Sequence, residues 1–243
     1  MHDIVILAAG QSDAETAAQT GAATRSALPW KGATLADHVH SVCREFADPI
    51  VVGGPSRTEW RQTHGGGSFV ESIEIGAGLV TTKKFLLVTA DLPYLKAESI
   101  RNFLADCNDD AGWNWPIIPM EDCRRDHPGL HRTSLKLREG EFTGGNICLI
   151  DIQAFQEAKP VIQAAYNARK SPLQLGQIAG LRTLLLIAAT KLFPYMVPVS
   201  AVESAVGAFL RSGVQAVVTH ASDIGTDIDT FAQYQAIIRG SES

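Results

Sequence analysis

The sequence predicts an α/β fold built on a mostly parallel sheet with helices on its faces. Apolar runs at residues 3–8, 49–52 and 85–90 have the length and composition of buried parallel strands. Stretches at 34–46 and 69–79 carry apolar residues at helical spacing, and the first has Thr34 in place to cap it. Strands that alternate with helices in this way are typical of a parallel α/β sheet.

Length and composition favour one domain over residues 1–243. The chain has 45% hydrophobic residues, enough for one large core, and its net charge of −5 argues against a nucleic-acid partner. The four cysteines are scattered without a C-x-x-C pair, which predicts reduced thiols in a cytoplasmic protein. The longest apolar stretch, 181–199, contains two charges and two prolines. It predicts a buried helix or a homodimer contact rather than a membrane span.

The first strand ends in Leu7-Ala8-Ala9-Gly10, a turn whose backbone N–H groups are expected to meet phosphate. The dinucleotide motif G-x-G-x-x-G fails after Gly10, so a hydride-transfer cofactor is not expected. A loop of small and polar residues is expected through Thr24. Arg25 and Lys31 beyond it are candidates to neutralise a triphosphate, and the alternative is a solvated loop with incidental charges.

Three aspartates are candidates for a metal site. Asp91 follows the strand at 85–90 directly, at the edge where open α/β sheets bind ligands. Asp227 and Asp229 alternate late in the chain, so both face one side. Carboxylates together with phosphate oxygens are what Mg²⁺ prefers. The alternatives are a helix cap or turn aspartate at 91 and a helix cap at 229.

Two glycine-containing stretches are further candidates. Gly65-Gly66-Gly67 precedes the helix at 69–79 and fits either a phosphate or base contact or a hinge. Residues 132–150 alternate and turn like an antiparallel insertion. Within it, Gly144-Gly145-Asn146 fits either an acceptor pocket or a β-bulge. Further elements are expected as helices at 96–107, 152–168 and 199–210, a strand at 216–219, and a last helix ending near 238.

Five motifs in order resemble the MobA-like nucleotidyltransferases: LAAG at 7–10, TRSALPWKG at 24–32, TADLP at 89–93, FTGGN at 142–146 and TDIDT at 226–230. The resemblance implies a Rossmann-like, three-layer fold of the GT-A type. It also implies transfer of a nucleoside monophosphate from an NTP to a phosphorylated or similar small acceptor, with release of pyrophosphate and a requirement for Mg²⁺.

The resemblance also implies roles for single residues. Arg25 and Asp91 would be catalytic, and Asp91 would bind the metal together with Asp227 or Asp229. The acceptor would lie against the stretch at 144–146. The nucleotide would contact Leu7, Ala8, Ala9, Gly10, Arg25, Gly66, Ser72 and Ala90.

The chain departs from the family pattern in its phosphate loop. The family has arginine four residues after the glycine and lysine soon afterwards, whereas this chain has Ala14 and, much later, Arg25. Arg25 is expected to replace the lysine, although arginine and lysine grip phosphate differently. A regulatory module that binds nucleotide without turnover therefore stays open as an alternative. A glycosyltransferase that uses a nucleotide-sugar is a second alternative, because it would share the sheet and the metal-binding carboxylate.

Overall fold

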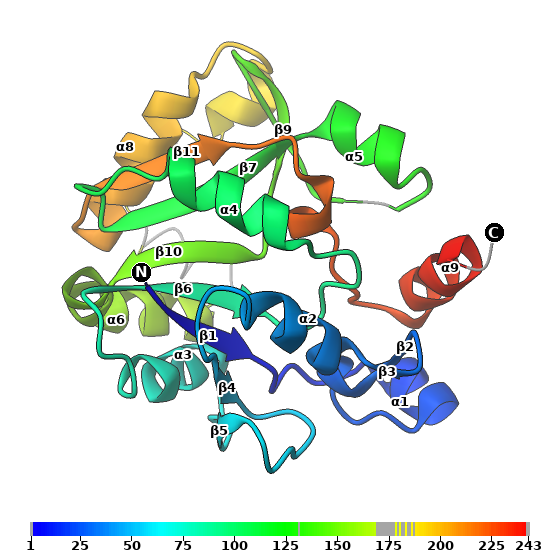
Figure 1. Cartoon of the computed structure of the whole chain (residues 1–243). Coiled ribbons are helices and arrows are strands. Elements are labelled where there is room, and N and C mark those ends of the chain that lie inside the picture. Colours follow the sequence, from blue (N-terminus) through cyan, green and yellow to red (C-terminus); the bar gives the residue numbers. More distant parts are fainter. Residues whose placement is uncertain are drawn as a thin grey trace.

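The computed structural model describes residues 2–130, 132–168, 178, 180, 183, 186 and 188–241 (Figure 1). Within them, nine strands form one mixed sheet in the order β5-β4-β1-β6-β10-β7-β9-β8, with β11 paired to β7. The strands are β1 (Asp3–Leu7), β4 (Ile50–Val52), β5 (Arg61–Thr63), β6 (Lys84–Thr89), β7 (Trp113–Pro119), β8 (Leu135–Leu137), β9 (Gly140–Gly144), β10 (Ile147–Asp151) and β11 (Val214–Val218).

The predicted fold class is confirmed. Strands β5, β4, β1 and β6 are parallel to one another, as β11 is to β7. The antiparallel part differs from expectation, because β10 lies between β6 and β7 and pairs antiparallel with both. The predicted insertion therefore continues the main sheet through β9 and β8 and does not pack on it as a separate unit.

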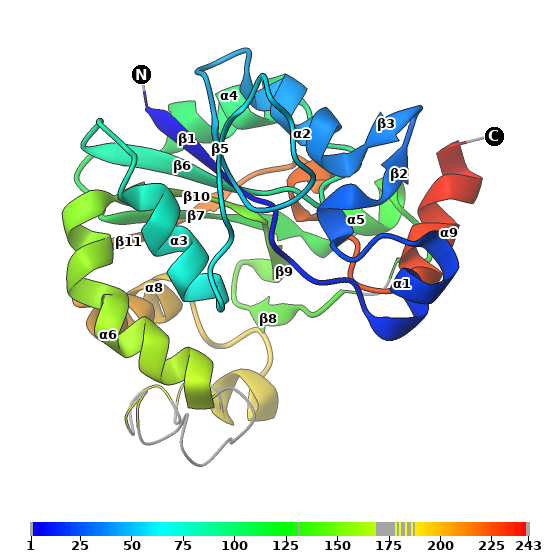
Figure 2. The same ribbon diagram turned by 90° about the horizontal axis from the view of Figure 1, so that it is seen from below.

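Helices cover both faces of the sheet (Figure 2). They are α1 (Ala14–Thr20), α2 (Leu35–Cys43), α3 (Phe69–Ala77), α4 (Ala97–Asp106), α5 (Met120–Asp126), α6 (Ile152–Ala168), α8 (Val199–Leu210) and α9 (Phe231–Ser241). Short 3₁₀ turns are η1 (Arg25–Ala27) and η2 (Ser222–Gly225), and β2 (Pro29–Trp30) pairs with β3 (Ala33–Thr34) in a small second sheet.

The alternation of side chains along β1 explains the layers. Ile4 and Ile6 point to the face covered by α2 and α4, whereas Val5 and Leu7 point to the face of α3 and α6. Thr34 starts α2 with a capping box, because its hydroxyl accepts from the Asp37 N–H and the Asp37 carboxylate accepts from the Thr34 N–H. This cap was predicted from the sequence.

The prediction of a loop between Gly10 and Thr24 is wrong for its middle part, where α1 forms. The Asp13 carboxylate accepts a hydrogen bond of 2.7 Å from the Thr16 N–H, and Gly21 ends the helix with a φ of 73°. An alanine-rich turn between such caps is enough for a short helix. Sequence reasoning also missed the short edge strand β5 and the helix α5.

The apolar stretch at 181–199 lies only in part within the described residues, so its role as a buried helix or a homodimer contact stays a prediction. Among the helices that are described, none has the length and apolar character needed to cross a membrane. All four cysteines are free, and three of them are buried.

Gly76 allows α3 to lie close to the sheet, which gives a stability prediction. A Cβ there would fall 2.4 Å from Val5 Cγ1, whereas a Cβ at the exposed Gly78 would meet only backbone oxygens at 3.4 Å or more. Gly76→Ala should therefore lower the free energy of unfolding in urea by about 1–3 kcal/mol. Gly78→Ala, at a φ of −66°, should be neutral or stabilising by up to about 1 kcal/mol. Equal effects of the two substitutions would contradict the close packing.

Candidate functional site

An arginine joins two carboxylates at the edge where β1 and β6 end. Arg25, at the start of η1, places its Nε 3.1 Å from Oδ2 of Asp91, in the turn after β6. Its Nη1 also donates to Oδ1 of Asp229, in the segment before α9. A backbone hydrogen bond of 3.2 Å from the Ile228 N–H to the Asp91 carbonyl holds that segment against the turn. The structure therefore brings Arg25, Asp91 and Asp229 together, as the sequence predicts.

The turn after β1 lies beside this arginine. The Arg25 N–H donates to the Gly10 carbonyl at 2.9 Å, and a Cβ on Gly10 would lie 3.0 Å from Arg25 Nη2. The Ser26 hydroxyl donates to the Ala8 carbonyl at 2.6 Å. In the described part of the chain, the N–H groups of Ala9 and Gly10 have no hydrogen-bond partner. They are therefore available to an anion.

The glycine stretch before α3 lies against the same turn. A Cβ on Gly65 would fall 2.6 Å from Cβ of Ala9. The Ser72 hydroxyl in α3 accepts a hydrogen bond of 3.0 Å from the Gly66 N–H. On the other flank, the Ala90 N–H donates to the Leu7 carbonyl at 3.0 Å. The predicted nucleotide-binding residues thus lie close together around the turn after β1, and Leu7, Ala8, Ser72 and Ala90 among them are buried.

The carboxylates of the site repel one another in a partly buried setting. Burial raises the pKa of Asp91, and the nearby Arg25 charge opposes that rise. Burial, together with the negative charges of Asp91 and Asp229, raises the pKa of Asp227 to about 6. Asp91 is 6% exposed, and its Oδ1 is buried without a hydrogen-bond partner among the described residues. The site therefore holds more negative charge than Arg25 alone can compensate.

Asp229 is not the cap of the last helix, which was the alternative for this residue. The Thr230 hydroxyl accepts from the Gln233 N–H, and the Gln233 side-chain oxygen accepts from the N–H groups of Asp229 and Thr230. The cap belongs to Thr230, so the Asp229 carboxylate is left to pair with Arg25. Asp91 is likewise no cap, since α4 begins after Lys96.

These carboxylates fit a cation that arrives with a phosphate ligand. No three His, Cys, Asp or Glu side chains in the described residues group closely enough to hold a metal ion by themselves. Mg²⁺, however, takes one or two carboxylates and completes its shell with substrate phosphates and water. The unpartnered Asp91 Oδ1 and the mutual repulsion of the aspartates suit such an ion.

The stretch Gly144 to Asn146 lines a cavity of about 830 Å³, which Asp227 and Asp229 also line. The Asn146 N–H donates to the Ile224 carbonyl, and the Asn146 carbonyl accepts from the Thr89 N–H at 3.2 Å. This stretch therefore lies between the end of β6 and η2, close to the aspartates.

Sequence reasoning missed Arg132, which also lines the cavity and whose guanidinium donates to the Gly225 carbonyl and the Thr226 hydroxyl. A single arginine before a strand carries no motif that would have revealed this contact. In contrast, the candidate Lys31 lies in the turn between β2 and β3, with its Nζ 5.1 Å from the Trp30 ring centroid.

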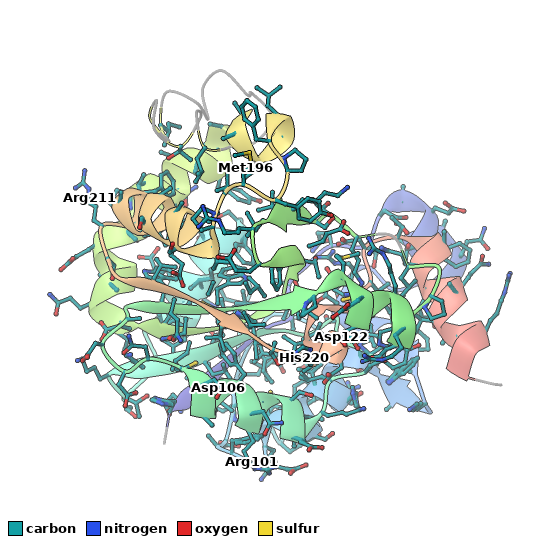
Figure 3. The ribbon with its side chains drawn as sticks, turned by 90° about the horizontal axis from the view of Figure 1, so that it is seen from above. Arg101, Asp106, Asp122, Met196, Arg211 and His220 are labelled. Atoms are coloured by element: carbon teal, nitrogen blue, oxygen red, sulfur yellow. The ribbon has the colours of Figure 1, made fainter. Side chains whose placement is uncertain are left out.

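The position of η2 depends on α5. Asp122 is 3% exposed, and its Oδ2 lies 2.6 Å from Nδ1 of His220 (Figure 3). The Ser222 hydroxyl donates to the Asp126 carboxylate at 2.7 Å. These two contacts hold the chain that leads into Asp227 and Asp229.

Comparison with known proteins places the chain in a family. A family model described as the MobA-like NTP transferase domain matches residues 4–146. A search of curated proteins finds no match.

The fold resembles several solved structures. A hypothetical transferase from Thermus thermophilus is 27% identical, with a TM-score of 0.84 over 96% of this chain and 99% of that one. A 2-C-methyl-D-erythritol 4-phosphate cytidylyltransferase, also from Thermus thermophilus, is 14% identical, with a TM-score of 0.57 over 99% and 100% of the two chains. A nucleotidyl transferase from Methanothermobacter is 14% identical, with a TM-score of 0.56 over 98% and 96%.

The last two likenesses concern the fold alone, whereas the family match spans the strands and turns that carry Gly10, Arg25 and Asp91. The chain belongs to the MobA-like NTP transferase domain family.

Proposed function

We propose that the protein is a Mg²⁺-dependent nucleotidyltransferase that transfers a nucleoside monophosphate from an NTP to a small acceptor and releases pyrophosphate. One observation carries the proposal: Arg25 joins Asp91 and Asp229 beside the Gly10 turn. The guanidinium, the two carboxylates and the free N–H groups of the turn therefore share one edge of the sheet. Open α/β sheets bind ligands at this edge. The net charge of −5 favours a free nucleotide over a polynucleotide.

In this proposal the turn Ala8 to Gly10 binds the phosphates through the N–H groups of Ala9 and Gly10. Backbone N–H groups at the end of a strand are suited to phosphate because they carry partial positive charge and are already fixed in place. Gly66 and Ser72 would border the base, and Leu7 and Ala90 would contact the nucleotide beside the turn.

Asp91, with Asp227 or Asp229, would hold Mg²⁺. The ion would neutralise the charge that develops on the leaving pyrophosphate. The residues of this chain would then contribute by holding the substrates in place. Arg25 would leave its carboxylate partners for the triphosphate, because the cation takes over the neutralisation of the aspartates.

The chemical step needs no covalent intermediate on the protein. An acceptor oxygen forms a bond to the α-phosphorus, the bond from the α-phosphorus to the bridging oxygen breaks, and that oxygen leaves with pyrophosphate. Positioning and electrostatic stabilisation supply most of the catalysis in such transfers. Gly144 to Asn146 would position the acceptor, because this stretch lies between the end of β6 and the cavity.

A second candidate is a regulatory module that binds nucleotide without turnover. The observation in its favour is that Arg25, which stands in for the family's lysine, is paired with two carboxylates. Nucleotide binding without pyrophosphate release would support this candidate. Release of free sugar from a nucleotide-sugar would instead support a glycosyltransferase.

The central prediction concerns Asp91. Asp91→Asn keeps the shape of the side chain and removes its charge, so pyrophosphate release should fall by about 100-fold or more while the melting temperature is retained. The matched control is Asp106→Asn, at the exposed end of α4 and away from the site (Figure 3). Its rate should equal that of the unaltered protein. The measurement is pyrophosphate release with each of the four NTPs, Mg²⁺ and a panel of acceptors. Unchanged release from Asp91→Asn would overturn the metal-binding role.

A second prediction concerns Arg25. Arg25→Ala should lower the rate by about 100-fold or more because one charge on the triphosphate is no longer stabilised. Arg25→Lys should recover part of the rate, since a point charge remains without the bidentate geometry. Arg101→Ala on α4 is the exposed control. If both Arg25 variants keep the full rate, arginine has no part in the chemistry.

A third prediction follows from the raised pKa of Asp227. Because its folded pKa of about 6 exceeds the ordinary value, the stability that it contributes is present at low pH and is lost as pH rises towards 6. Without metal, the unfolding free energy of the unaltered protein should fall between pH 4 and pH 7 relative to that of Asp227→Asn. Asp106→Asn should follow the unaltered protein. Urea unfolding with a chelator present, at several pH values, measures this free energy. Parallel curves of unfolding free energy against pH for Asp227→Asn and the unaltered protein would contradict the prediction.

A further inference from the structure

The cavity beside the predicted acceptor residues continues far beyond them. Its volume of about 830 Å³ lies within the usual range of small-molecule sites, about 300–1,000 Å³. Asp227, Asp229, Asn146 and Arg132 lie at its polar end. The remaining lining is mostly carbon and comes from the face of the sheet that α3, α6 and α8 cover (Figure 2).

The apolar part is long enough for a sizeable group. Ile117 pairs with Gly144 at the polar end, and Trp113 lies four residues away on the same strand. Both line the cavity, and four residues of a strand span about 13 Å. On the opposite wall, Val199, Val202 and Val206 share one face of α8. The cavity is therefore an apolar channel that leads away from the aspartates.

Part of this apolar lining is open to water. Phe69, Trp115, Leu135 and Val206 all line the cavity, and each keeps 37–47% of its surface exposed. They come from α3, β7, β8 and α8, so exposed apolar surface from four elements gathers around one opening. Grouped exposure of this kind marks a binding surface more often than scattered single residues do.

We propose that the acceptor is an amphiphile: a phosphate monoester whose apolar body fills the channel between the sheet and α8, with its phosphate beside Arg132 at the polar end. This inference rests on the proposed function and adds the acceptor class to it. In the reaction, a phosphate oxygen of the amphiphile bonds to the α-phosphorus of the NTP, and pyrophosphate leaves from the other side. The product is a nucleoside diphosphate ester with an apolar tail.

The test is a series of straight-chain alkyl phosphates from butyl to decyl, used below their micelle concentrations. Calorimetry on the full chain, with Mg²⁺ and without nucleotide, gives their dissociation constants, because the cation offsets the repulsion between the phosphate and the aspartates. Each methylene that is fully buried tightens binding by up to about fourfold, so affinity should rise steadily along the series. Affinity that is flat from butyl to decyl would overturn the proposal.

A pair of variants separates the channel from general detergent-like binding. Val206→Asp puts a charge on the α8 wall of the channel, whereas Val218→Asp makes the same change on an exposed valine of β11 that does not line the cavity. Val206→Asp should weaken the binding of decyl phosphate by about 10-fold or more and that of butyl phosphate far less. Val218→Asp should change neither. Both valines are at least 37% exposed, so folding is retained and is checked by circular dichroism. Equal effects of the two variants would contradict a channel site.

Pyrophosphate release with the same series distinguishes the two proposals. Binding that depends on chain length, without release for any NTP, supports the apolar channel and counts against the transferase. Release with small polar phosphates, together with flat binding along the series, supports the transferase and refutes the amphiphilic acceptor. Release that rises with chain length and falls in Val206→Asp supports both. A further experiment presents the amphiphilic phosphate in lipid vesicles. Pyrophosphate release faster than with soluble decyl phosphate would identify a membrane source of the acceptor.

Discussion

The arrangement of the site depends on the charge of Arg25. Its guanidinium links the turn after β6 to the segment before α9, and its backbone N–H is bonded to the turn after β1. Removing this cation would leave the buried Asp91 beside Asp227 and Asp229 without compensation, which is costly at low dielectric. Arg25 thus neutralises the carboxylates only in part, and a metal-bound triphosphate would have to take over these pairings.

The topology of the sheet explains why donor and acceptor surfaces meet. Strand β10 runs antiparallel to β6, with Ile147 opposite Val88. The residues just before β10, Gly144 to Asn146, therefore fall at the end of β6, next to Asp91. A wholly parallel sheet would put that stretch at the opposite edge. The same strand order forms one wall of the apolar channel. Strands β7 and β9 follow β10 in the sheet, and side chains from both line the cavity.

The sequence predicts the parallel core, the Thr34 cap and the family, since these follow from local patterns and short motifs. It also predicts that Asp91 lies near the Gly10 turn, because strand ends in a parallel sheet share an edge. It does not predict α1, whose caps lie within a polar stretch, or the role of Arg132, whose partners are 93 and 94 residues away. The channel could not be predicted from the sequence either, because its walls come from separate strands and helices. Magnesium, the nucleotide and acceptor contacts, residence in the cytoplasm and the homodimer stay predictions.

The most direct test of the central claim is a crystal structure with Mn²⁺ and a non-hydrolysable NTP, in which anomalous scattering locates the cation. The expected result is one Mn²⁺ bound to Asp91 and to Asp227 or Asp229, with the triphosphate on the Gly10 turn and Arg25 turned from the carboxylates to phosphate. A triphosphate bound there without a cation, with Arg25 still paired to Asp91 and Asp229, would contradict the claim.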